Sequence, residues 1–389
     1  MKILNLKIEG FRSLKTIDWS PGDLNVVIGP NNGGKSNLLN ALEMIAASAR
    51  GQLAKFVKSQ GGMEPLVWDG QAEDLNFDIQ TSQFHEINKD ALSYTLKIQR
   101  GGKTPSYLID YEHLYMKDRP IELFKCTSTE VVLFDSDGKK EIHKREQTAN
   151  SETFLSSTDS PFKANQWISQ YRKRIVSWKI YSDFHTSRNS SIRQAFITSY
   201  EKGIESDGKN FIAVLHTFYE EDRDFRQEIN QAMKAAFGDD FEELSFAPAA
   251  DTRSQLRIFW KSLKKPRSAA DISDGTLRFL YLLTILAHPE PPALIAIDEP
   301  ETGLHPSMLP IIAEYAVEAS RKTQVILTTH SPEFLSAFGD NQKDVKVTVA
   351  EWEDGQTKLL MLEGETFDYW LDKYSLGELY RSGQLEDME

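Results

Sequence analysis

Apolar residues along this chain repeat with two different periods. Short apolar runs occur at residues 3–9 and 24–28, and apolar and polar residues alternate over most of 75–135. A period of two is typical of strands, so the long alternating stretch predicts an antiparallel meander. Apolar positions recur at helical spacing up to about residue 50 and again within 161–240. This part of the chain therefore predicts a strand-rich segment followed by a helical one.

The C-terminal part alternates between strands and helices. Its apolar runs predict a strand at 256–260, a helix from about 275, a strand at 293–297, a helix from about 307, a strand at 324–328 and a closing pair near 345 and 358. Such alternation is the pattern of an α/β fold. Two stretches lack either period. The Gly- and Gln-rich residues 51–71 predict a loop, and the polar residues 141–160 predict a flexible connection between lobes.

The stretch VVIGPNNGGKSNLLNAL, residues 26–42, carries the most specific chemical signal. Gly29, Gly34, Lys35 and Ser36 fit the G-x-x-x-x-G-K-[ST] pattern of a phosphate-binding loop. That pattern requires a strand before it and a helix after it, and both are predicted here. A glycine-rich turn that merely precedes Lys-Ser would not need these flanks, so we interpret the stretch as a nucleotide site.

The composition of this loop suits an anion. Glycine accepts positive φ, and asparagine is the next most tolerant residue. The first N–H groups of a helix have no partners within it and can point at a bound phosphate. The lysine would reach the β- and γ-phosphates of ATP, and the serine hydroxyl would ligand Mg²⁺. We therefore expect ATP and Mg²⁺ as cofactors, bound by Gly29, Asn31, Asn32, Gly33, Gly34, Lys35, Ser36 and Asn37.

Two acids stand at the end of a second apolar run, in PALIAIDEPETGLHP at residues 292–306. A continuous apolar run is typical of a parallel strand buried on both faces, and ligands bind at the carboxyl edge of such sheets. Asp298 would hold Mg²⁺ together with Ser36, and Glu299 would polarise the water that attacks the γ-phosphate. The alternative is a pair of ordinary acids on a solvated turn, which the phosphate-loop pattern makes less attractive.

Two further strand or helix ends carry candidate residues. In QVILTTHSPEFL, His330 follows an apolar strand and could contact the γ-phosphate, although a lone histidine is more often structural. In DISDGTLRFLYLLTIL, Ser273 is a helix N-cap candidate. The same turn could instead offer a second anion-binding helix N-terminus. Both interpretations of Ser273 stay open on residue pattern alone.

Composition narrows the class of protein. The 389 residues carry a formal net charge of −13, which argues against a sequence-independent nucleic-acid coat but leaves room for a local basic groove. The single cysteine, Cys126, excludes an internal disulfide and a cysteine-based zinc site. The N-terminus shows no secretory signal, and no apolar run approaches the roughly 20 residues of a membrane span. We expect a cytoplasmic protein.

One segment, residues 170–193, mixes basic and aromatic side chains. Basic residues among aromatics can bind single-stranded nucleic acid. The plainer interpretation is an element of a helical lobe with aromatic residues in its core and charges in solvent, and the acidic chain as a whole favours it. The residues concerned are Tyr171, Arg172, Lys173, Arg174, Trp178, Lys179, Tyr181, Phe184, Arg188 and Arg193.

The order of GPNNGGKSN, SDGT, IDEPE and TTHS resembles the ABC-type ATPases of the SMC, RecF and OLD group. LKIEGFRSL near the start is similar to that group, and YSLGELYRSGQL near the end is similar to its small stand-alone bacterial members. The resemblance covers roughly residues 1–50 and 265–380. It implies an ABC-type P-loop NTPase head, an α/β fold with a mixed central sheet, an antiparallel β meander and an inserted helical lobe.

In that group two heads sandwich two ATP molecules. The resemblance therefore implies a homodimer, or a higher oligomer, in which Ser273, Asp274 and Gly275 contact the γ-phosphate held by the partner's loop. It matches Arg12 of FRS to a basic residue near the nucleotide. A glutamine usually completes Mg²⁺ coordination in the group, and Gln60 and Gln71 are both candidates.

The resemblance has two departures. The signature reads SDGT instead of Ser-Gly-Gly-Gln, and the turn after the acids reads PETGLHP, with His305 near an aspartate of transporter ATPases. Many OLD proteins carry a TOPRIM nuclease domain after the head, for which about 60 residues after His330 leave no room. We therefore expect a separate chain to supply any nuclease chemistry.

These observations predict three sequence segments and one activity. Residues 1–140 would form the N-terminal part of the ATPase lobe, 141–265 a helical lobe and 266–389 the C-terminal part of the ATPase lobe. Lys35, Glu299 and His330 would carry ATP hydrolysis. The head would dimerise around ATP and control a separately encoded effector, a nuclease or toxin of anti-phage defence or genome surveillance. The alternative is a RecF-like repair ATPase that binds DNA directly, and no membrane partner is expected.

Overall fold

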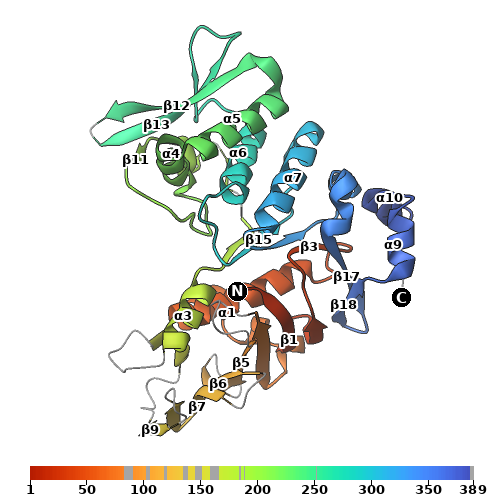
Figure 1. The fold of residues 1–389 in the computed structure, drawn as a ribbon. Helices are drawn as coiled ribbons and strands as arrows, with labels where there is room; N and C mark the ends of the chain where they lie inside the picture. The colour runs from red at the N-terminus through yellow and green to blue at the C-terminus, as the bar shows by residue number, and fades with distance from the viewer. Residues whose placement is uncertain are drawn as a thin grey trace. The chain divides into compact units, whose positions relative to one another are not determined.

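The computed structural model describes residues 1–82, 91–101, 106–117, 121–134, 139–144, 151–157, 166–183, 185–187, 189–250 and 252–385. These residues form two compact units (Figure 1). Unit 1 comprises 1–178 and 346–362, and unit 2 comprises 179–345 and 363–389. No helix among the described ranges has the length and apolar character that crossing a membrane requires.

Unit 1 is built on an eight-stranded sheet of consecutive antiparallel neighbours, in the order β2-β1-β4-β5-β6-β7-β8-β9. The alternation in the sequence places the apolar residues of each strand on one face of the sheet. Partly exposed and buried residues therefore alternate along the whole of β4. The meander predicted over 75–135 is confirmed. Its strands are β1 (Ile3–Phe11), β2 (Leu14–Trp19), β4 (Asp74–Thr81), β5 (Leu92–Arg100), β6 (Tyr107–Met116), β7 (Ile121–Thr127), β8 (Glu130–Phe134) and β9 (Lys140–Lys144).

The phosphate-loop motif lies in the remaining elements of unit 1. Strand β3 (Leu24–Ile28) is buried at every position and leads into helix α1 (Lys35–Arg50). In the strand order, β3 is followed by β17 (Val345–Glu353) and then by β18 (Gln356–Leu362), and β17 and β18 pair as an antiparallel hairpin. Segments from both ends of the chain therefore build one compact unit.

A buried carboxylate fastens residues 151–157 to the meander of unit 1. Glu112 accepts hydrogen bonds from the Tyr94 hydroxyl at 2.9 Å and from the N–H groups of Phe154 and Leu155 at 2.6 and 2.9 Å. Glu152 in turn accepts from two N–H groups at the start of helix α2 (Leu53–Ser59). The prediction of a flexible connection at 141–160 is wrong for these residues, because a sequence pattern does not reveal a distant buried acid.

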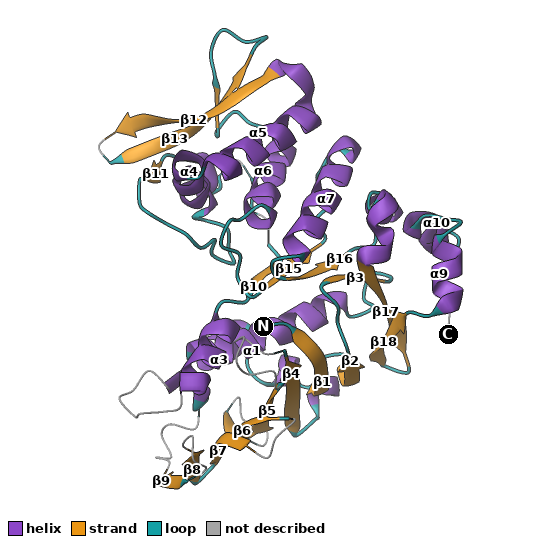
Figure 2. Ribbon diagram, viewed as in Figure 1, coloured by secondary structure: helices purple, strands orange, loops and turns teal. Residues whose placement is uncertain are grey.

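Four helices and a parallel set of strands form the centre of unit 2 (Figure 2). Strand β15 (Leu294–Asp298) pairs in parallel with both β10 (Lys179–Tyr181) and β16 (Gln324–Thr328). The parallel strands are almost wholly buried, as their continuous apolar sequences require. The helices are α4 (Phe211–Glu221), α5 (Arg223–Phe237), α6 (Asp274–Leu286) and α7 (Leu309–Ser320).

Unit 2 also contains a hairpin sheet and a helical C-terminus. The sheet consists of β11 (Phe196–Ile197), β12 (Phe241–Ala250), β13 (Arg253–Trp260) and β14 (Arg267–Ser268). Helix α10 (Leu376–Arg381) packs directly on α8 (Pro332–Ser336) because Gly377 leaves no gap: a Cβ there would lie 2.0 Å from the Pro332 carbonyl oxygen. Helix α9 (Glu365–Leu371) precedes α10. The YSLGELYRSGQL stretch is therefore a helix-packing element.

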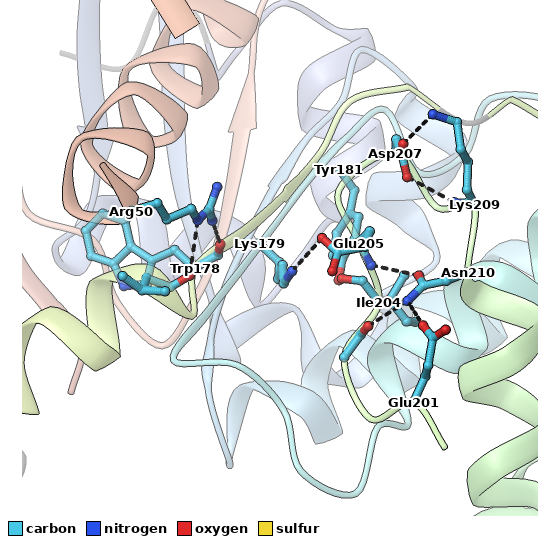
Figure 3. A network of polar contacts seen from close by, with 12 residues as sticks. Arg50, Trp178, Lys179, Tyr181, Glu201, Ile204, Glu205, Asp207, Lys209 and Asn210 are labelled. Carbon is cyan, nitrogen blue, oxygen red and sulfur yellow. Dashed lines mark hydrogen bonds and ion pairs between the residues drawn. The ribbon is translucent and has the colours of Figure 1, made fainter. Parts of the chain in front are cut away.

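Figure 3 shows the polar contacts on either side of the chain passage from unit 1 to unit 2, each within its own unit. In unit 1, Arg50 donates to the backbone carbonyls of Val176 and Trp178. In unit 2, Asn210 accepts from the Glu205 N–H at 2.9 Å and donates to the Gly203 carbonyl at 3.0 Å. These contacts hold the start of α4 and the end of α3 (Gln166–Val176).

Several elements differ from the sequence prediction. Residues 51–71, predicted as a loop, contain helix α2, which is short and ends before Gly61 and Gly62. Strands β2, β10 and β12 and the C-terminal helices were not predicted, since each is short or lacks a clean period. The sequences RGGKTP at 100–105 and DSDGKKE at 135–141 predict hairpin turns, and these segments lie largely outside the described residues.

Acid should weaken unit 2 through His288. Its Nε2 lies 2.6 Å from the Lys202 carbonyl and its Nδ1 accepts from the Glu290 N–H at 3.0 Å, so the neutral ring is fully bonded. Burial lowers the pKa of His288. A lowered histidine pKa means that the unfolded chain binds the proton first, so stability is complete above about pH 6.5 and falls as the pH drops below that value.

The measurement is the denaturant midpoint of wild type and His288→Gln at pH 7.5 and pH 5.5. The wild-type midpoint should fall more between the two pH values than that of the variant. Equal falls for the two proteins would contradict the role of this ring.

Candidate functional site

The phosphate loop has the backbone conformation that an anion cradle needs. Gly29 and Gly34 adopt φ of 137° and 98°, and Asn32 adopts 72°. Gly34 is the N-cap of α1. Because glycine has no side chain, it cannot accept a hydrogen bond from the first N–H groups of the helix. The structure therefore brings together the eight predicted loop residues in one turn, with Asn31, Asn32 and Ser36 exposed and Gly33 and Gly34 buried.

The β17–β18 hairpin closes the back of this loop. A Cβ on Gly29 or Gly33 would lie 2.2 or 2.5 Å from the Ala350 carbonyl oxygen, and one on Gly34 would lie 2.0 Å from Thr357 Oγ1. No side chain fits at these three positions. The glycines are thus required by close packing inside unit 1 as well as by any approach of a phosphate.

The side chain of Lys35 folds back onto its own loop. The side chain is buried, and Nζ donates to the carbonyl oxygens of Gly29 at 2.7 Å and Pro30 at 3.0 Å. A buried ammonium needs such acceptors because desolvation of a charge is costly. The two carbonyls carry only partial charge, so a phosphate would be a stronger partner for the same group.

Arg12 joins the loop through a polar network within unit 1. It lies in the turn between β1 and β2 with φ of 48°, and its Nη1 donates to Asn37 Oδ1 at 3.3 Å. Asn37 donates to Ser13 Oγ at 2.7 Å, which lies 2.7 Å from Thr357 Oγ1. Burial lowers the pKa of Arg12, and its Nε is buried without a hydrogen-bond partner. A strained, partly unsatisfied cation at this point suits an anionic ligand.

The two candidate glutamines have different surroundings in the structure. Gln60 lies at the end of α2 and accepts a 2.5 Å hydrogen bond from Arg12 Nη2. Gln71 is exposed in the turn that follows Trp68. We propose Gln60 as the glutamine of the nucleotide site.

The acids predicted at a strand end occupy the carboxyl edge of β15 in unit 2. Asp298 pairs with Thr328 on the neighbouring strand β16, and the Thr328 hydroxyl donates to its carboxylate. Glu299 follows in a left-handed conformation, with φ of 48°, and its N–H donates to the Thr328 carbonyl at 3.1 Å. A non-glycine residue in this region is strained, and such strain is concentrated at functional sites.

His330 meets Glu299 directly. Its Nδ1 lies 2.9 Å from Glu299 Oε1, and both side chains are partly exposed. Next to them, Thr329 donates to Glu301, whose pKa is raised by burial. The strand-end acid and the strand-end histidine thus form one contacting pair. Sequence reasoning placed both residues but not their contact, and it overlooked Glu301.

The predicted signature turn is the N-terminus of α6. Ser273 Oγ accepts from the Thr276 N–H at 3.1 Å, which confirms the N-cap. The turn packs against the segment after the acids, since a Cβ on Gly275 would lie 2.8 Å from the Gly303 carbonyl oxygen. Asp274 forms an ion pair with Arg193. Sequence reasoning missed this pair because the two residues are far apart in the chain.

The described aromatic residues of 170–193 are core residues. Tyr171, Trp178 and Tyr181 are all buried, and Arg172 donates through Nε to the Ala49 carbonyl at 3.1 Å. Buried rings cannot stack on bases, so these three offer no platform for nucleic acid. The favoured interpretation, a structural element, is confirmed for them, whereas Phe184 and Arg188 lie outside the described residues.

The family model described as "AAA domain, putative AbiEii toxin, Type IV TA system" matches residues 24–336. The chain belongs to this AAA-domain family. The match spans the phosphate loop, the signature turn, the acids and His330. None of the curated proteins matches this AAA-domain protein.

Solved structures place its fold. The AAA-domain protein is similar to an SMC head bound to the C-winged helix domain of ScpA, with 14% identity, a TM-score of 0.54, and coverage of 95% of this chain and 100% of that chain. It is also similar to an SMC head with an extended coiled coil bound to the C-terminal domain of ScpA derived from Pyrococcus furiosus, with 13% identity, a TM-score of 0.51, and coverage of 96% and 99%. The predicted ABC-type α/β head is confirmed.

The residues present fit ATP and Mg²⁺. The start of α1 has no side-chain cap at Gly34, and Ser36 is exposed in the first turn of α1. Across the described ranges no cluster of three or more His, Cys, Asp or Glu side chains is arranged to hold a metal ion. A Mg²⁺ ion of this type takes one hydroxyl, one carboxylate and phosphate oxygens, so it does not call for such a cluster.

Proposed function

We propose that this protein binds and hydrolyses ATP. The observation that carries the proposal is the phosphate loop of unit 1, in which a buried Lys35 is held between two carbonyls in a glycine turn with no room for side chains. The pair of Glu299 and His330 in unit 2 supplies a carboxylate with a proton partner at 2.9 Å. A general base of this kind contributes about 10²–10⁴ in rate.

In the proposed mechanism each group has one task. Lys35 and the loop amides would bind the phosphates, and Ser36 and Asp298 would hold Mg²⁺, which would supply positive charge to the γ-phosphate. Glu299 accepts the proton of the attacking water, and His330 orients Glu299 and contacts the γ-phosphate. The ion pair of Asp274 and the cap of Ser273 belong to a turn that meets the γ-phosphate on a second head. Arg12 and Gln60 stand beside the loop as its polar support.

We further propose that an ATP-bound homodimer controls a separately encoded effector. The matching family carries the description of a putative toxin of a type IV toxin–antitoxin system, and both SMC heads of similar fold were solved with a domain of ScpA, a different protein. A head of this fold that works through a second protein is consistent with these names. A nuclease or toxin is the effector class that we propose.

The second candidate is an ATPase that binds DNA directly. The resemblance of the sequence motifs to the SMC, RecF and OLD group favours it, whereas the burial of Tyr171, Trp178 and Tyr181 removes these rings as a platform for base stacking. The net charge of −13 also limits any DNA surface to a local patch.

The test is the ATPase rate of the purified protein with and without double-stranded DNA at low salt, with Glu299→Gln as the blank. We expect a rate well above the blank that DNA leaves unchanged. A rise of severalfold with DNA would favour the second candidate. A rate equal to the blank under both conditions would overturn hydrolysis itself.

A further inference from the structure

We propose that Arg193 is a positioning residue that neutralises Asp274 and thereby lets the signature turn approach a phosphate. The inference rests on the proposed ATP-dependent dimer. The turn reads Ser-Asp-Gly-Thr and therefore places an acid, Asp274, where an anionic ligand is expected. A carboxylate next to a phosphate is repelled unless a cation compensates it.

Arg193 is buried and its guanidinium group is hydrogen-bonded at every nitrogen. It ends the short turn Ser191–Arg193, and only 5% of its surface is exposed. Nε donates to the Thr186 carbonyl at 2.8 Å, and Nη1 donates to the carbonyls of Ala269 and Ile272 at 2.9 and 2.6 Å. Nη2 donates to the carboxylate of Asp274. All three guanidinium nitrogens therefore have a partner, and three of the four acceptors lie within residues 269–274, which lead into the signature turn.

The pair is asymmetric in exposure. The side chain of Asp274 is 65% exposed, whereas that of Arg193 is 5% exposed. The acid thus stands at the surface of the turn while its counter-ion lies behind it, inside unit 2. Loss of Arg193 would free a surface carboxylate beside the α6 N-terminus and would also release the carbonyls of the segment that leads into Ser273.

The rest of the turn is ordered by contacts of its own. Ser273 Oγ and Thr276 Oγ1 lie 2.7 Å apart, and the Thr276 N–H is capped, so the helix start is already ordered. Gly275 sits against Gly303 with no room for a Cβ. With Asp274 held by Arg193, the order of the turn does not depend on the ligand, and its net charge next to an incoming phosphate is close to zero.

The experiment compares dimer formation and hydrolysis in five proteins. These are wild type, Arg193→Met, Arg193→Lys, Arg193→Met with Asp274→Asn, and Arg226→Met. Arg226 is the matched control, since in the same unit it donates to the backbone carbonyls of Tyr219 and Glu220, away from the signature turn. ATP-dependent dimers are measured by light scattering in a Glu299→Gln background, and ATP binding by fluorescence of a labelled ATP analogue.

Arg193→Met should bind the analogue as wild type does but lose about 10- to 100-fold in dimer affinity and in ATP turnover. Adding Asp274→Asn should restore at least about threefold, because the repelling charge is gone. Added salt should strengthen the Arg193→Met dimer, since screening reduces like-charge repulsion. A purely structural role would produce neither the rescue nor the salt response. Arg193→Lys keeps the positive charge and should retain more activity than Arg193→Met. It replaces Arg193→Met in the comparison if the methionine variant does not fold.

Each contrary outcome has a distinct meaning. A wild-type protein that forms no dimers with ATP would overturn the proposed function, and the role of Arg193 with it. Wild-type dimers together with an Arg193→Met protein that dimerises equally well would overturn the role of Arg193 alone. The same holds if Arg193→Met is weakened but Asp274→Asn brings no recovery.

Discussion

Replacing Glu299 with glutamine should stop ATP hydrolysis while leaving ATP bound. The amide keeps the shape of the side chain and can still contact His330, but it cannot accept a proton from water. The loss should be about 100-fold or more in turnover, the range that a general base contributes. Because Lys35 and the loop of unit 1 are untouched, binding of ATP should persist, and the dimer should accumulate.

The measurement pairs steady-state phosphate release with light scattering in ATP. Glu318→Gln is the control, since Glu318 is an exposed acid on α7 whose only described role is an ion pair with Arg321. That variant should behave as wild type. If Glu299→Gln hydrolysed ATP within a fewfold of wild type, the base would have to be sought elsewhere, with Glu301 the next group to test.

Replacing Gly34 with alanine should destroy the nucleotide site. The new Cβ would lie 2.0 Å from Thr357 Oγ1 and 2.8 Å from its Cγ2, and the backbone φ of 98° is unfavourable for any L side chain. Thr357 cannot simply turn away, because its hydroxyl lies 2.7 Å from Ser13 Oγ. Overpacking and backbone strain together should cost about 2–5 kcal/mol of folding free energy.

Thermal unfolding and binding of a fluorescent ATP analogue check this prediction. Gly203→Ala is the control, because a Cβ at that position meets nothing within 4 Å. The double variant Gly34→Ala with Thr357→Ala should recover part of the stability, since it removes the two shortest contacts but keeps a Cβ–Cβ distance of 2.9 Å and the strained φ. Normal ATP binding by Gly34→Ala would show that the hairpin of β17 and β18 does not close the loop as described.

Local patterns could be predicted and distant contacts could not. The phosphate loop, the Asp-Glu pair, His330 and the Ser273 cap each lie in one short stretch whose residue types carry the chemistry, and each was found where its flanking strand or helix placed it. The meander followed from a period of two, which also fixes the buried face.

The missed features all depend on residues far apart in the sequence. Arg193 looks like a surface cation in a basic stretch, yet it is buried because carbonyls about 80 positions later accept its hydrogen bonds. Glu112 reads as one polar residue of an alternating strand, but it anchors residues about 40 positions away. Helix α2 was overlooked because seven residues followed by two glycines are too short to show a period.

The phosphate loop is completed by residues that are synthesised long after it. Ser13 and Thr357, which brace it together, are 344 positions apart. At about 5–20 residues per second, the ribosome adds the second partner roughly 20–70 s after the first. Until Thr357 has been added, a nascent chain therefore carries the whole ATP-binding motif without the hairpin that shapes it. Unfinished or truncated copies should be unable to compete for nucleotide or to join a dimer.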